Sequence, residues 1–153
     1  MAQAYIRTGN TRTGFSIVFH ELFDLYHPYI GDKATMYYLY LLRFRNNERG
    51  GQAEGKSWKG RNSVVEKFQL SFSTLPLLDE ILEASGLVTI ERKPVGRGKD
   101  KIYYIVHDPS SREKFRESEG DMRESLSKLI DEDRPIKNLL GKEEGAKLTL
   151  EKG

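Results

Sequence analysis

The residues that most suggest chemistry are the eight from Gly50 to Ser57, which read GGQAEGKS. They fit the pattern G-x-x-x-x-G-K-[ST], in which backbone N–H groups and a lysine cradle nucleotide phosphates. Such a loop needs a buried strand directly before it and a helix directly after it. Here the loop is preceded by apolar residues with helical spacing and then by the polar run RFRNNERG. Gly60 lies where the helix after the loop would start. We therefore interpret the stretch as a flexible basic loop and expect no cofactor.

A second candidate is a metal site, because His20, Asp24 and His27 recur at positions i, i+4 and i+7 of one helix face. Pro28 follows at once and disfavours helical geometry at His27, so we expect these side chains to be rim residues and not metal ligands. The chain has no cysteine, which excludes thiolate metal sites and cysteine nucleophiles. No spacing suggests a Ser–His–acid arrangement. We expect no enzymatic activity.

Apolar spacing predicts two helices in the first third of the chain. The first carries apolar residues from Phe19 to Tyr26 and is predicted to stop at Pro28 and Gly31. Asp32 is expected to cap the second, DKATMYYLYLLRFRNN. A loop with a short extended piece at Trp58 follows. The inward face of the second helix is predicted to hold Met36, Leu39, Tyr40 and Phe44, flanked by Tyr37 and Leu41.

The middle of the chain predicts two more helices and a β-hairpin. SVVEKFQL reads as a short helix capped by Ser63, and SFSTLPLLDEILEAS as another, capped by Ser71 or Ser73 and ended by Gly86. The runs LVTIERK and KIYYIVHD are rich in Val, Ile and Tyr, and PVGRGK joins them as a hairpin.

Charge density rises after Pro109, and apolar residues become sparse. We interpret this region as a loosely held helix around Leu126, Leu129 and Ile130 plus disordered residues available to a partner. The predicted organisation is therefore a basic arm over residues 1–13, one domain over 14–110 and a charged tail over 111–153. No apolar run approaches the roughly 18 residues of a membrane span, and the N-terminus has no apolar signal-peptide core. We expect a cytoplasmic protein.

The net charge of +2 is unevenly distributed. Residues 43–61 hold six basic residues against two acidic ones, and residues 92–101 hold five against one. These two clusters are the candidate surfaces for an anionic partner such as nucleic acid. Two solvated loops would have the same composition, so charge alone leaves both interpretations open.

The order of predicted elements is helix, helix, short strand, helix, turn, helix, hairpin, which is the order of a winged helix-turn-helix. The stretch EKFQLSFSTLPLLDEILEASGLVTIERKPVGRGKDKIYYIV resembles winged-helix domains of bacterial regulators and replication initiators. The matching positions are the polar turn and cap Ser71, Ser73 and Thr74, the inward stripe Leu75, Leu78 and Leu82, and the helix end Gly86, Leu87 and Val88.

The stretch FSIVFHELFDLYHPYIGDKATMYYLYLLRFRNN is similar to the first helices of the DnaD/DnaB-type N-terminal domains and related phage and plasmid replication proteins. The likeness covers about residues 14–108. It implies an α+β, mainly α fold, a winged helix-turn-helix with a C-terminal β-hairpin wing, here followed by a charged C-terminal extension. In that family the winged domain is associated with oligomerisation and primosome assembly, and DNA affinity lies partly elsewhere.

The helix over residues 71–85 departs from a DNA-reading pattern, because it holds no Lys or Arg. Its predicted exposed positions include Asp79, Glu80 and Glu83, and each carboxylate placed in a major groove would cost on the order of a kcal/mol. We predict that this helix does not read base edges. Phe72, Pro76 and Leu77, rimmed by Glu80, are either a protein interface or, for Phe72 and Leu77, part of the core.

We predict instead that DNA is contacted by the wing, the basic loop and the arm, largely at phosphates and through groove shape. The protein would be a DNA-associated winged-helix protein of replication-initiation or mobile-element type, with a protein partner or self-association and no small-molecule substrate. The alternatives are a transcriptional regulator, an assembly module that does not bind DNA, and a nucleotide-binding enzyme using Lys56 and Ser57. The predicted DNA-contacting residues are Arg7, Arg12, Lys56, Lys59, Arg61, Arg92, Lys93, Arg97, Lys99 and Lys101.

Overall fold

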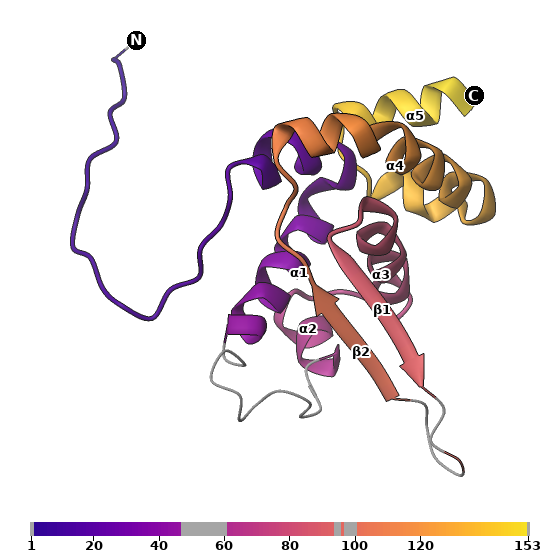
Figure 1. Cartoon of the computed structure of the whole chain (residues 1–153), viewed down its shortest axis with the longest axis horizontal. Helices are drawn as coiled ribbons and strands as arrows, with labels where there is room; N and C mark the ends of the chain where they lie inside the picture. Colours follow the sequence, from indigo (N-terminus) through magenta and orange to yellow (C-terminus); the bar gives the residue numbers. More distant parts are fainter. Residues whose placement is uncertain (1, 47–60, 94–95, 97–100, 153) are drawn as a thin grey trace.

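The computed structural model describes residues 2–46, 61–93, 96 and 101–152. Over these residues the chain is α+β and mainly helical, with a two-stranded antiparallel sheet, which confirms the predicted class. Figure 1 shows the helices gathered around the base of the hairpin, whose distal end projects from the body. Residues 2–19, here called the arm, precede the first helix in extended form and run away from the body.

The first two predicted helices follow each other without a loop and are separated by a break at Gly31, one of the two predicted stop positions. A π-helical turn, η1 (Leu22–Tyr26), leads directly into α1 (His27–Asn46), and His27 has helical φ/ψ of −54° and −39°. The helix passes through Pro28, so the predicted stop at that residue is wrong. The break comes at Gly31, where φ is 83° and ψ is 178°, so the stop predicted at this glycine is confirmed.

The break at Gly31 receives the C-terminal part of the chain. The Gly141 N–H donates to the Tyr29 carbonyl over 2.9 Å. A side chain on Gly31 would collide with the Leu139 carbonyl, and one on Gly141 would collide with the Pro28 carbonyl. Both positions thus need glycine so that the two backbone segments can approach each other.

The buried face of α1 is displaced from the predicted one. Tyr37, Tyr38 and Leu41 are buried, whereas Met36 is 51% exposed. The buried tyrosines are tolerated because their hydroxyls find acceptors: Tyr38 donates to the His107 carbonyl over 2.7 Å. The sequence prediction grouped Met36 with the core because apolar residues occur on nearly all sides of this helix.

The two helices that follow are α2 (Arg61–Lys67) and α3 (Thr74–Ser85). Because α2 begins before Ser63, that serine lies inside the helix and not at its cap. Ser73 occupies the N-cap position of α3, but the hydroxyl that accepts from the Thr74 N–H, over 3.2 Å, belongs to Ser71. Gly86 ends α3 in the left-handed conformation, as predicted.

The predicted hairpin is confirmed. Strands β1 (Val88–Lys93) and β2 (Lys101–Val106) pair in antiparallel fashion. The register runs from Val88 opposite Val106 to Lys93 opposite Lys101. Val88 is buried at the base of the hairpin, where β1 packs against α3. Apart from Gly96, the connection between the strands lies outside the described residues, as does the predicted extended piece at Trp58.

The C-terminal region is part of the folded body, so the prediction of a loosely held tail is wrong. It forms α4 (Arg112–Glu132), the 3-10 turn η2 (Arg134–Asn138) and α5 (Glu144–Lys152). A narrow apolar stripe in a highly charged sequence suffices to pack α4 against α3, η2 and α5. The buried residues of this region are Phe115, Met122, Leu126, Ile130, Ile136, Leu140 and Leu148.

A polar contact joins α4 to α1 beside this stripe. The Tyr29 hydroxyl donates to Glu119 over 2.5 Å and accepts from Arg123 over 3.0 Å. Burial, and then the hydrogen bond to Glu119, raise the pKa of Tyr29 to about 12. The hydroxyl therefore stays protonated at neutral pH and can keep donating.

Candidate nucleic-acid interface

Basic residues gather at one end of the molecule. In Figure 1 the C-terminal end of α1, the helix α2 and the distal end of the hairpin all lie toward the same end, opposite α4 and α5. We call this region the basic end. Among the side chains that the structure describes there, the acidic ones are Glu66 and Glu91, and the basic ones are Arg43, Arg45, Lys67 and Arg92.

The hairpin contributes the last two pairs of its ladder to the basic end. Lys93 lies opposite Lys101, and Arg92 lies opposite Ile102. The predicted residues Arg97 and Lys99 lie outside the described residues.

Helices α1 and α2 supply the rest of the basic end. Arg43 is exposed, with its guanidinium 5.1 Å from the centre of the Phe44 ring. Arg45 has a structural role instead, because it pairs with Asp108 over 2.9 Å and donates to the Val106 carbonyl over 3.2 Å. Lys67 is exposed, and its ammonium lies 5.9 Å from the Tyr40 ring.

Of the remaining predicted DNA-contacting residues, Arg61 is the first residue of α2, and Lys56 and Lys59 precede it outside the described residues. Arg7 and Arg12 are exposed on the extended arm, which runs away from the body (Figure 1). The basic end is therefore built from the hairpin, α1 and α2.

Helix α3, the second helix of the predicted motif, carries fewer exposed carboxylates than the sequence suggests. Asp79 was predicted to be exposed but is 2% exposed. Its two oxygens accept hydrogen bonds from Tyr37, over 2.8 Å, and from Tyr104, over 3.0 Å. Asp79 thus links α3 to α1 and β2. Glu83 remains exposed, and the helix still has no basic residue.

The predicted protein interface is divided between exposed and packed residues. Phe72 is 72% exposed, which removes it from the core, and Pro76 is also exposed. Leu77 is partly buried and packs against the core. We call the region formed by Phe72, Pro76, Leu77 and Glu80 the Phe72 surface.

Glu80 stands in an unfavourable electrostatic environment at the edge of the Phe72 surface. Its Oε2 atom is buried and has no hydrogen-bond partner among the described residues. Burial is the main cause that raises its pKa, and nearby Asp133, Glu132 and Glu83 raise it further. Arg92 acts in the opposite direction, so this arginine lies close enough to α3 to favour the charged form of Glu80.

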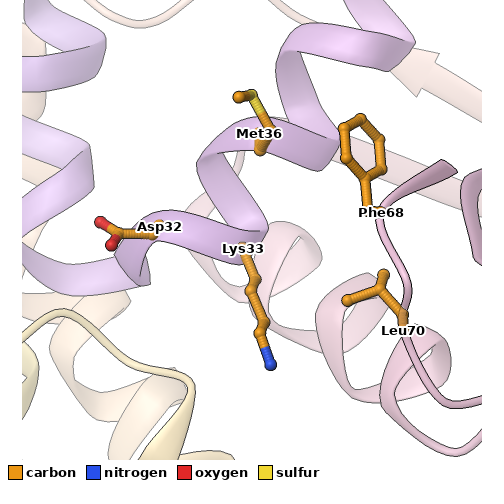
Figure 2. A pocket seen from close by; sticks show the side chains of 5 residues that line it. All are labelled: Asp32, Lys33, Met36, Phe68 and Leu70. Carbon is orange, nitrogen blue, oxygen red and sulfur yellow. The ribbon is translucent and has the colours of Figure 1, made fainter.

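A small pocket lies between the first part of α1 and the loop that follows α2. Its volume is about 230 Å³, and we call it the Met36 pocket. In Figure 2, Met36 projects from α1, and Phe68 and Leu70 lie on the segment beside it. Asp32 points away from these three side chains. Asp32 instead contacts His27 over 2.6 Å. The lining residues are Asp32, Lys33, Met36, Phe68 and Leu70.

The loop side of the Met36 pocket is fixed by the end of α2. The Leu70 N–H donates to the Val65 carbonyl over 3.0 Å, and the Gln69 N–H donates to the Glu66 carbonyl over 3.4 Å. These bonds form a Schellman motif, with Gln69 in the left-handed region at φ 53°. The sequence does not predict this pocket, because nothing in it indicates that Gln69 adopts the left-handed conformation.

The candidates for other chemistry are dispersed in the structure. His27 pairs with Asp32, and Asp24 lies 3.8 Å from Arg112. Within the described ranges, no three His, Cys, Asp or Glu side chains lie together in a way that could hold a metal ion. The stretch from Gly50 to Ser57 lies outside the described residues, but the element before it is the helix α1, as expected. Among the described helices, none combines the length and apolar character required to cross a membrane.

Comparison of the chain with protein-family models, with curated proteins and with solved structures finds no match.

Proposed function

We propose that this chain is a DNA-associated protein of winged-helix type, acting in replication initiation or in a mobile element. The basic end, including the β-hairpin as the wing, would contact the phosphate backbone. The Phe72 surface would bind a protein partner. The order of helices followed by an antiparallel hairpin supports the winged-helix assignment.

The observation that carries the proposal is the gathering of cations at the basic end. The exposed residues Arg43, Lys67 and Arg92 come from three separate elements, α1, α2 and β1, that reach the same end of the molecule (Figure 1). A projecting two-stranded ribbon is thin enough to follow a groove of B-DNA. Neutralising several phosphates together releases counterions, which gives sequence-independent affinity.

The chemistry of α3 argues that the contact is with the backbone more than with base edges. A helix that reads the major groove presents Arg, Lys, Asn or Gln to the bases. The exposed positions of α3 instead include Pro76 and Glu83. DNA recognition would therefore depend on phosphate positions and groove shape.

The exposure of Phe72 favours an alternative function, that of a protein-assembly module that does not bind DNA. Phe72 exposes 72% of its surface beside Pro76 at the start of α3. Exposed apolar residues rimmed by acids suit a protein contact. A winged-helix transcriptional regulator would use the same basic end and would differ in having a preferred DNA sequence.

Fluorescence anisotropy with a labelled random-sequence duplex across a salt series tests the proposal. We expect binding whose affinity falls linearly with the logarithm of salt concentration. The variant Lys93→Ala plus Lys101→Ala should bind more weakly, and its salt slope should be smaller by about 1.8, because two phosphate contacts are lost.

The matched control is Lys114→Ala plus Lys137→Ala, which removes the same charge from exposed positions on α4 and η2. This control should retain the slope and affinity of the unmodified chain. Equal losses of affinity in the Lys93/Lys101 and Lys114/Lys137 double variants would mean that net charge alone drives binding. Absence of binding at low salt would leave the assembly module as the better account, and a strong preference for one sequence among many would favour the regulator.

A further inference from the structure

The outward face of α3 changes its chemistry along the length of the helix. Pro76 and Glu83 are exposed, and the helical repeat places both on the side of α3 that also carries Glu80. Phe72 is 72% exposed and precedes α3 at the same end as Pro76. The Phe72 surface is therefore apolar at the N-terminal end of α3 and acidic toward the C-terminal end.

The end of α4 adds negative charge beside these carboxylates. Helices α3 and α4 pack together, and Glu132 and Asp133 at the end of α4 lie close enough to Glu80 to act on its charge. Burial is the main cause that raises the pKa of Glu80, and the carboxylates around it raise it further. Arg92 acts in the opposite direction. We call Glu80, Glu83, Glu132 and Asp133 the acidic rim.

The ends of the two helices strengthen the negative field at the acidic rim. The C-terminal end of an α-helix carries a partial negative charge that a cation near the last turn offsets. Neither α3 nor α4 has a basic residue in its last turn. The Oε2 atom of Glu80 is buried and has no hydrogen-bond partner in the described part of the chain. A cation supplied by another molecule would offset the carboxylates and the helix ends together.

We propose that the Phe72 surface binds a basic segment of another protein. An apolar side chain of that segment would pack against Phe72 and Pro76, and its lysines or arginines would lie against the acidic rim. Charge complementarity selects this partner, because the acidic rim repels an acidic segment and also repels DNA. The inference rests on the protein-binding role proposed above for this surface, and it adds the chemistry of the partner.

The geometry of α3 sets the spacing within the bound segment. An α-helix rises about 1.5 Å per residue, so Pro76 and Glu83 lie roughly 10 Å apart along the helix axis. The segment therefore needs its apolar side chain about 10 Å from its cations, which corresponds to about seven residues of a helix or three residues of a strand.

Selection of displayed peptides on the immobilised full chain tests the chemistry of the partner. The probe is a phage library of random peptides about 12 residues long, which is enough to span this spacing. We expect the enriched peptides to carry a net positive charge and a large apolar residue. Their affinity should fall at least about tenfold in Phe72→Ser. It should be unchanged in Phe23→Ser, which makes the same substitution at an exposed phenylalanine of η1.

The contribution of charge is measured by fluorescence anisotropy with the tightest of these peptides. Glu80→Gln plus Glu83→Gln should raise the dissociation constant about tenfold, and the difference from the unmodified chain should shrink as salt concentration rises. Glu113→Gln plus Glu117→Gln is the matched control, because it removes the same charge from exposed positions near the start of α4. This control should leave the dissociation constant unchanged.

The outcomes separate this inference from the function proposed above. Enrichment of acidic or uncharged peptides that still require Phe72 would overturn the basic partner and leave a protein-binding surface. No enrichment, or peptides that bind Phe72→Ser equally well, would overturn the protein-binding role too. Light scattering that shows a dimer lost in Phe72→Ser would identify a second copy as the occupant and overturn the inference. The DNA contact is measured separately, with variants of the basic end.

Discussion

The clearest prediction concerns Leu126, which lies in the middle of α4 and is fully buried. Replacing it with alanine removes three carbon atoms from the hydrophobic core and leaves a cavity. Leu→Ala substitutions at such sites cost about 2–5 kcal/mol, through lost transfer free energy and the cavity itself. Against a total stability of about 5–15 kcal/mol, this loss is large. Urea denaturation followed by circular dichroism should show a lower midpoint with an unchanged m-value.

Leu150→Ala is the control, because it makes the same chemical change on α5 at a position that is 79% exposed. We expect it to alter the free energy of unfolding by less than about 0.5 kcal/mol. If Leu126→Ala changed stability no more than Leu150→Ala, the residues from 112 onward would be the loosely held tail that their composition suggests, and the packing described here would be wrong.

Three further changes test separate parts of the structure. Gly141→Ala should destabilise the protein by about 1–3 kcal/mol in the same denaturation assay, because its new methyl group meets the backbone of α1. Gly120→Ala is the control: Gly120 has open space around it in α4, so this change should stabilise the protein by about 0.5–1 kcal/mol. Tyr37→Phe should cost about 1.5–3 kcal/mol by removing a donor to the buried Asp79 carboxylate, and no loss would contradict that contact. Glu80→Gln should raise the melting temperature at pH 7 and have less effect near pH 4. The pKa of Glu80 is raised in the folded state, so the folded state binds the proton more tightly, and stability falls as pH rises between the unfolded and folded pKa values. An equal gain at both pH values would refute this assignment.

The sequence predicts those parts of the fold that have strong local signals. The hairpin follows from two Val-, Ile- and Tyr-rich runs around a Gly-rich connection, and the end of α3 follows from Gly86. Pro28 shows the limit of such rules, because the helical run that begins before the π-helical turn passes through this proline and breaks only at Gly31.

The burial of individual side chains was less predictable, because it depends on contacts between distant segments. Asp79 appears in the sequence as one more exposed carboxylate on a polar helix. Its burial requires Tyr37, from α1, and Tyr104, from β2, to meet at one point. In the same way, the spacing of Phe115, Met122 and Leu126 is visible along α4, but only the break at Gly31 creates the place where the C-terminal segment can pack.

The candidate DNA contact was predictable in composition but not in arrangement. The two basic clusters are evident from charge counts, but the sequence does not show that the C-terminal end of α1 and the distal end of the hairpin lie toward the same end of the molecule (Figure 1). The Met36 pocket could not be predicted, since it depends on the left-handed Gln69.

The proposed DNA contact is tested most directly by mapping it on the folded protein. Amide NMR spectra of the ¹⁵N-labelled chain, recorded during titration with a random-sequence duplex, would report which residues meet DNA. We expect the shift changes to concentrate in α2, the C-terminal end of α1 and the strand residues next to the hairpin tip, with Glu83 and the rest of α3 nearly unchanged. Changes centred on α3, or a spectrum that DNA leaves unaltered at low salt, would contradict the proposal.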